Sequence, residues 1–177
     1  LFLALVLTAG GVYLVYRMRA VTPGIYYLRA DGNDGNLGTS NSSSGAWKTL
    51  GRALGYKDGV AQSTPAPGDK VLVYDDGGNF IVTETISNSN SGTAGNPIVI
   101  EAAASESPVF DGNNGNLKVI SLRNKRFLTF RGLTFQNFTL TGGGTWGKQA
   151  LEFIDGSDNI VLDSSIFDDI LLDETLV

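Results

Sequence analysis

The chain has 177 residues, of which 23 are Gly and 42% are hydrophobic, so we expect one domain with a core of useful size. Thirteen basic residues against 18 acidic ones leave a formal charge of −5, which disfavours a nucleic-acid partner because such proteins usually carry a basic stripe. Cys and His are both absent, which excludes disulfides, thiolate chemistry, the usual zinc sites and a His-based triad.

Residues 1–16 are uncharged and largely apolar, and Arg17 and Arg19 follow directly. This stretch predicts an apolar helix over residues 1–20 that acts as a signal or an anchor. Three roles stay open: an uncleaved membrane anchor, a cleaved secretory signal, or a packing helix through which copies assemble into a filament. Because residue 1 is Leu rather than Met, we expect the native start to lie upstream.

A short linker at 21–24 is expected to join this segment to one domain over residues 25–177. The domain is predicted to open with a strand at 25–30 and a long polar loop at 31–45. The DGNDGN segment of this loop superficially resembles a calcium loop, but Gly35 stands where a third oxygen ligand would be needed. We therefore interpret the segment as a turn.

After this loop the spacing of the apolar residues changes from that of a strand to that of a helix. Trp47, Leu50 and Leu54 recur at helical spacing after Ser44, a suitable N-cap residue, and predict a short helix over 46–54. Such a helix would cover the open edge of the first strands, which could otherwise pair with another chain. Trp47 is accordingly expected in the core.

Three later segments repeat one pattern about every thirty residues: PIVIEAA at 97–103, FLTFRGLTF at 127–135 and NIVLDSSIF at 159–167. Within each segment apolar residues alternate with polar ones, which is typical of a strand with one buried face. A fixed period indicates coils that stack on one another, because a single coil cannot bury its own apolar face.

Aligning the three segments places their apolar residues in columns. One column holds Ile98, Leu128 and Ile160, and the next holds Ile100, Phe130 and Leu162. Val71 and Val73 lie 27 residues before Ile98 and Ile100, so we expect them to form the preceding coil. An antiparallel sandwich would explain the strand spacing, but it would not explain the matched columns.

The same alignment also places charges in columns. Glu101, Arg131 and Asp163 would lie on successive coils, about 4.8 Å apart in a parallel stack. Arg123 would likewise lie over Asp155, and Arg126 over Asp158. Two interpretations stay open for these charges: ion pairs between coils, or a polar groove that binds an anionic polysaccharide.

Several segments, in order, carry a resemblance to a known group. They are YYLRADGNDGNLGTS, AWKTLGRAL, APGDKVLVYDDGG, SGTAGNPIVIEAA, SPVFDGN and FLTFRGLTFQNF. Their order resembles the opening of right-handed parallel β-helix proteins of the pectate lyase-like superfamily, over roughly residues 25–170. The resemblance implies an all-β fold, a right-handed parallel β-helix (a solenoid) with a short N-terminal cap helix.

The resemblance also implies a function. It points to an extracytoplasmic carbohydrate-active protein, secreted or anchored at the cell surface, and in particular to a polysaccharide lyase that cleaves uronate polymers by β-elimination with Ca²⁺. In such lyases the calcium-binding carboxylates and a basic residue lie on later coils, and no position here matches them. Because the stack has no evident closing cap, we expect the chain to be incomplete at its C-terminus. The alternative is a non-enzymatic adhesin or filament subunit that anchors or self-assembles through residues 1–20.

Two sets of residues are candidates for binding. An exposed aromatic face with cations suits an acidic polysaccharide, and the substrate-binding candidates are Trp146, Lys148 and Arg131. Calcium needs six to eight oxygen ligands, and the metal-binding candidates are Asp168, Asp169 and Asp173. An alternative remains for each set: the Trp146 ring folds back over the stack, Arg131 forms an ion pair between coils, and the three aspartates lie in a solvated turn.

Overall fold

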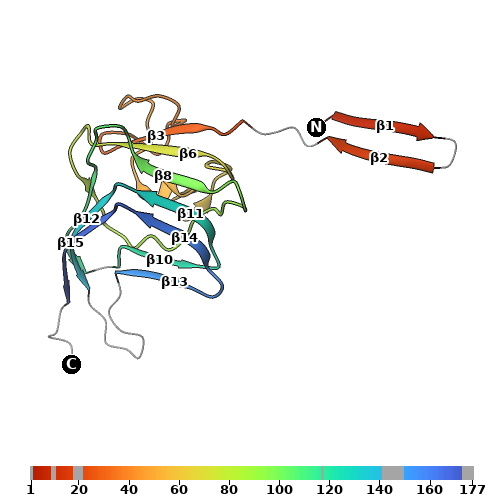
Figure 1. The fold of residues 1–177 in the computed structure, drawn as a ribbon. Helices are drawn as coiled ribbons and strands as arrows, with labels where there is room; N and C mark the ends of the chain where they lie inside the picture. Colours follow the sequence, from red (N-terminus) through yellow and green to blue (C-terminus); the bar gives the residue numbers. More distant parts are fainter. Residues whose placement is uncertain (1, 9–10, 18–21, 117, 141–149, 173–177) are drawn as a thin grey trace.

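The computed structural model describes residues 2–8, 11–17, 22–116, 118–140 and 150–172 (Figure 1). In this part of the chain nearly all regular structure is β, and most strands lie in three parallel sheets. Each coil of the chain passes through the sheets in turn, so the strands of one coil stack on those of the next. This is a parallel β-helix, and the predicted all-β fold is confirmed.

The first sheet holds five strands. It contains β3 (Ile25–Arg29), β6 (Lys70–Tyr74), β8 (Ile98–Ala102), β11 (Arg126–Arg131) and β14 (Asp158–Asp163). Figure 1 shows them stacked in sequence order, from orange at β3 through green to blue at β14. The antiparallel sandwich is therefore excluded, since every pairing in this sheet is parallel.

The other two sheets complete the coils. The second sheet contains β7 (Phe80–Ile81), β9 (Val109–Asn116), β12 (Thr134–Leu140) and β15 (Ile166–Leu172). The third sheet contains β10 (Ile120–Arg123) and β13 (Leu151–Ile154), and a parallel bridge from Ile86 to Ile120 extends it by one coil.

The predicted columns are found in the first sheet. Leu128 pairs with both Ile98 and Ile160, and Phe130 pairs with Ile100 and Leu162. The alternating pattern therefore identified both the strands and their register across three coils.

The register predicted for the preceding coil was wrong by two residues. Val71 pairs with Ile100, not with Ile98, and Val73 pairs with Ala102. Side chains alternate with a period of two along a strand, so a shift of two keeps the same residues in the core. Both valines are fully buried, and hydrophobic alternation alone could not separate the two registers.

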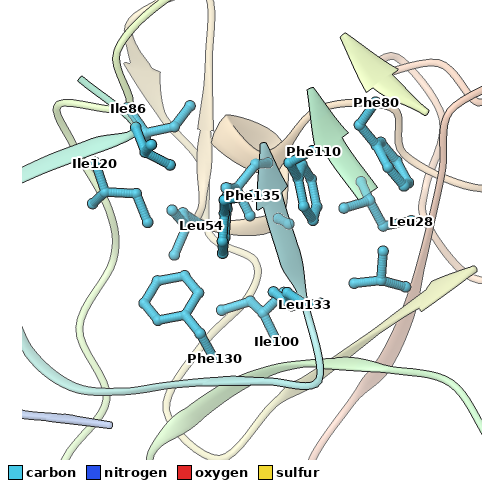
Figure 2. Packing of buried hydrophobic residues seen from close by; sticks show 14 of the residues in the cluster. Leu28, Leu54, Phe80, Ile86, Ile100, Phe110, Ile120, Phe130, Leu133 and Phe135 are labelled. Carbon is cyan, nitrogen blue, oxygen red and sulfur yellow. The ribbon is translucent and has the colours of Figure 1, made fainter. Parts of the chain in front are cut away.

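A column of aromatic rings lies beneath the second sheet, buried at Phe80, Phe110 and Phe135 and exposed at its last ring, Phe167. Phe80, Phe110, Phe135 and Phe167 stack with centroid distances of 4.7, 5.3 and 5.2 Å. Figure 2 shows the first three rings beside one another among the aliphatic side chains of the core. Such pairs add to the stability that burial of the rings already provides.

The cap helix is shorter than expected. Helix α1 covers Leu50–Ala53, and its N-cap is Thr49, whose hydroxyl accepts a hydrogen bond from the Arg52 amide at 3.1 Å. Ser44 is therefore not the N-cap. The residues before Thr49 are held in extended form, because Trp47 exchanges backbone hydrogen bonds with the strand β3.

Trp47 lies in the core, as expected, with none of its surface exposed. Its ring stacks on Tyr26 with centroids 4.7 Å apart, and the Arg52 guanidinium lies 3.9 Å from its centroid. The polar loop before it packs closely on the indole: a Cβ built on Gly38, whose φ is +75°, would lie 2.4 Å from the Trp47 ring. Glycine is needed there for both its conformation and its small size.

The helix expected over residues 1–20 is not confirmed. The structure has two antiparallel strands there, β1 (Phe2–Thr8) and β2 (Gly11–Arg17), paired with each other from Phe2–Arg17 to Thr8–Gly11. The β-branched and aromatic residues of VYLVY favour a strand, and glycine disfavours a continuous helix. None of the helices in the described part of the chain has the length and apolar character needed to cross a bilayer. The anchoring, signal and assembly roles stay predictions.

Candidate functional site

Charged side chains form a ladder on the outer face of the first sheet. Arg131 donates to Glu101 Oε2 at 3.0 Å from one side and to Asp163 Oδ2 at 2.7 Å on the other, as the alignment predicted. Lys70 Nζ extends the ladder with a bond of 2.6 Å to Glu101 Oε1. The hydrogen bond that Arg131 donates to Asp163 raises the pKa of Arg131. Because the signs alternate, the ladder largely neutralises itself, and the guanidinium of Arg131 is already occupied.

Of the other candidates from the sequence, Trp146, Lys148 and Asp173 lie outside the described residues. Asp168 and Asp169 are exposed on β15, and Asp169, at φ +49°, occupies the bend that Asn137 forms in the preceding coil. Among the residues that the structure places, no group of three or more Asp, Glu, His or Cys side chains could hold a metal ion. The calcium site at Asp168, Asp169 and Asp173 therefore stays a prediction.

A groove lies over the outer face of the third sheet. It has a volume of about 450 Å³. It lies over β10 and β13 and beside residues 87–88, which follow the bridge at Ile86. The residues that line it are Ser87, Asn88, Ser121, Arg123, Asn124, Lys125, Glu152 and Ile154. All but one are polar, which suits a ligand rich in hydroxyl and carboxylate groups.

Glu152 is held at the floor of this groove by two donors. Ser121 pairs with Glu152 across the sheet, and its hydroxyl donates to Oε2 at 2.5 Å. Lys118 Nζ lies 3.1 Å from Oε1. The hydrogen bond from Ser121, and then the one from Lys118, lower the pKa of Glu152. Glu152 is therefore an ionised group at neutral pH with its charge matched by Lys118.

Two further cations stand at the end of the strands. Arg123 pairs with Asp155, and both side chains are more than half exposed, at 69% and 55%. Lys125 forms no ion pair among the described residues; its ammonium group lies 5.9 Å from the centroid of the Tyr56 ring. An exposed Arg and a Lys beside an aromatic face can bind an anionic sugar.

Tight bends fix the position of Lys125. Asn124, at φ +52°, and Asp155, at φ +53°, bend the chain at the same place in successive coils. Asn and Asp tolerate this left-handed conformation better than other residues with a side chain. The backbone N–H of Lys125 donates to the Ser157 hydroxyl at 3.0 Å, so the bend is tied to the next coil. The site is thus built on a rigid corner.

Most of this groove was missed from the sequence. The predicted ion pair between Arg123 and Asp155 is present, although Arg123 lies opposite Ile154 in the sheet; Ser121, Glu152 and Lys125 were not singled out. Ser121 and Glu152 become neighbours only once LKVISL and ALEFI are known to be stacked strands. Extending the column alignment to those two segments is the signal that could have found them.

No protein-family profile matches this sequence, and no curated protein does either. Among the solved structures that resemble the fold are two lyases. A rhamnogalacturonan lyase superposes with a TM-score of 0.56 at 19% identity over 77% of this chain, and this chain spans 34% of that protein's length. The pectate lyase Pel9A superposes with a TM-score of 0.46 at 20% identity over 82% of this chain, and this chain spans 39% of the length of Pel9A.

The first of these likenesses, together with the parallel sheets, identifies the fold. The protein is a parallel β-helix, the fold that the resemblance implied. At 19% identity the likeness is one of fold, and a fold of this kind hosts more than one function.

Proposed function

We propose that the protein is a carbohydrate-active β-helix protein that binds a uronate-containing polysaccharide in the groove over the third sheet. The observation that carries the proposal is Lys125, a cation on a rigid corner that lies beside an aromatic ring and has no ion pair among the described residues. Arg123 stands two residues away at the same end of the groove. The rhamnogalacturonan lyase with the same fold supports a polysaccharide as the class of ligand.

The activity that we propose is β-elimination, with the protein acting outside the cytoplasm. Elimination removes the proton next to the uronate carboxyl group, forms a carbon–carbon double bond and breaks the glycosidic C–O bond. Lys125 would neutralise the carboxylate, with Arg123 beside it, which makes that proton easier to remove, and hydroxide from water would take it. The leaving oxygen receives its proton from water.

A binding and activity assay tests the proposal. The 177-residue chain is titrated with oligosaccharides of polygalacturonate, alginate and chondroitin, and the unsaturated product is followed by ultraviolet absorbance. Lys125→Ala should weaken binding of the preferred oligosaccharide about tenfold, or about 1.4 kcal/mol, and should abolish product formation. The matched control is Lys70→Ala, a half-exposed lysine on the first sheet, which should leave both unchanged.

Each outcome of this assay decides something. Failure of the wild-type chain to bind any of the three acidic polysaccharides would overturn the proposal. Binding without product formation would remove the lyase activity and favour the alternative of a non-enzymatic surface protein.

A further inference from the structure

The groove over the third sheet does not end at the sheet. A second hollow of about 200 Å³ adjoins it, and Ser87 and Asn88 line both. The Tyr56 ring belongs to the second hollow, whereas Lys125, 5.9 Å from the centroid of that ring, belongs to the first. The two hollows therefore form one continuous path along the surface.

A small hairpin builds the far wall of the second hollow. Its strands are β4 (Tyr56–Lys57) and β5 (Val60–Ala61), joined by Asp58 and Gly59 at φ +51° and +74°. Asp-Gly is a preferred pair for such two-residue turns, because both positions need a positive φ. Asn90 donates to the carbonyls of Gln62 and Pro65 at 3.0 and 2.8 Å, so the hairpin is anchored to the body of the protein.

The two hollows differ in charge. The groove over the third sheet is lined by Glu152, whose charge Lys118 matches, by Arg123, which pairs with Asp155, and by Lys125, whose positive charge is left over. The hollow at the hairpin has the opposite balance, with one cation and three carboxylates. Its charged lining residues are Lys57, Asp34, Asp58 and Glu84. An acidic sugar unit is thus favoured in the first hollow and repelled from the second.

The second hollow still has the features of a sugar site. Tyr56 is half-buried and offers an aromatic face, and the exposed side chains of Ser87 and Asn88 can exchange hydrogen bonds with hydroxyl groups. The carboxylates of Asp58 and Glu84 are good acceptors for sugar hydroxyls, because a charged acceptor strengthens the bond. These groups suit a sugar without a carboxylate.

We propose that the hollow at the β4–β5 hairpin binds an uncharged sugar unit, next to an acidic unit held by Lys125 and Arg123. The ligand is then a heteropolysaccharide in which neutral and acidic units are neighbours, rather than a polymer of uronate alone. This inference rests on the proposed binding of a polysaccharide in the groove, and it adds the specificity of that site.

Calorimetric titration with two oligosaccharides of equal length tests this inference. One alternates uronate with neutral sugar units, and the other contains uronate alone. The wild-type chain should bind the mixed oligosaccharide about tenfold more tightly. Tyr56→Ala should remove this preference, so that the two oligosaccharides bind with equal affinity. The matched control is Tyr74→Ala on the first sheet, which should leave the preference intact.

A second variant keeps the test independent of any effect of Tyr56→Ala on folding. The double substitution Asp58→Asn and Glu84→Gln removes two carboxylates at exposed positions, and Asn-Gly still suits the hairpin turn. It should raise the affinity for the all-uronate oligosaccharide about threefold.

The outcomes separate this inference from the proposed function. Equal wild-type affinity for both oligosaccharides, with no gain in the double variant, overturns the inference but leaves acidic polysaccharide binding in place. Binding of neither oligosaccharide overturns the proposed function itself.

Discussion

Asp111 is a nearly buried carboxylate that ties neighbouring coils together. Burial raises the pKa of Asp111, but hydrogen bonds from Gln136, the Asn113 amide, Asn137 and Asn79 outweigh this and hold it below its ordinary value. The donor–acceptor distances are 2.9, 2.7, 3.0 and 3.3 Å in that order. One side chain thus satisfies donors from its own coil and from both adjacent ones.

Replacing this carboxylate should destabilise the protein. Asp111→Asn leaves one acceptor oxygen and turns an amide toward other donors, so we expect the free energy of unfolding at pH 7 to fall by about 1–3 kcal/mol in urea titrations. The folded pKa is depressed, so the contribution of the carboxylate is present above the unfolded value of about 3.9 and is lost as pH falls through the folded value.

The difference between variant and wild type should therefore shrink below about pH 4. Asp155→Asn, at an exposed site, serves as the control and should change little. A difference that stays constant from neutral to acidic pH would contradict the role of the ionised carboxylate.

At the level of elements, helix α1 offers a direct choice between two N-cap residues. Thr49 accepts from the Arg52 amide at 3.1 Å and donates to Asp34 at 2.6 Å, whereas Ser44 lies in the preceding loop. Thr49→Ala should lower the free energy of unfolding by about 1 kcal/mol in thermal or urea unfolding, since a cap and a second bond are lost. Ser44→Ala should have a smaller effect, and the reverse order would show that the helix begins earlier.

The sequence predicted the strands of the β-helix because their apolar residues alternate and recur. Leu128 and its partners could be aligned without a structure, since a coil that buries one face repeats its pattern. The register of Val71 could not be fixed, because positions two apart share a face. The first residue of α1 could not be predicted either. Trp47 has helical spacing to Leu50, but its backbone hydrogen bonds to β3 hold it in extended form.

The candidate site was less predictable than the fold. Lys125 stands out only when it is known to lie on a corner beside Tyr56, a residue 69 positions earlier in the chain. The hairpin that carries Tyr56 is encoded by Asp58-Gly59 between short apolar stretches, but it is too brief to show a period. A site formed between segments with no shared repeat leaves no pattern in the sequence.

At the scale of the whole molecule, the charge ladder on the first sheet crosses four coils but carries little net charge. Arg131→Gln should lower the free energy of unfolding only slightly, because solvent screens ion pairs between exposed side chains. This loss should become smaller as salt is added to the urea titration.

The same variant also separates the ladder from the groove. Because its guanidinium already binds two carboxylates, Arg131→Gln should leave the affinity for acidic oligosaccharides unchanged within about twofold. A large loss of affinity would instead assign Arg131 to the binding surface, as the sequence first suggested.

Successive coils differ in length although their strands stay in register. Paired positions along the first sheet are Ile25 and Lys70, Val71 and Ile100, Ile98 and Leu128, and Leu128 and Ile160. The first pair spans 45 positions and the others 29, 30 and 32, and the surplus of the first holds the cap and the β4–β5 hairpin. Evolution can therefore lengthen or replace a corner segment without re-pairing the strands. The wall of the groove can therefore change while the pairing of the scaffold strands stays the same.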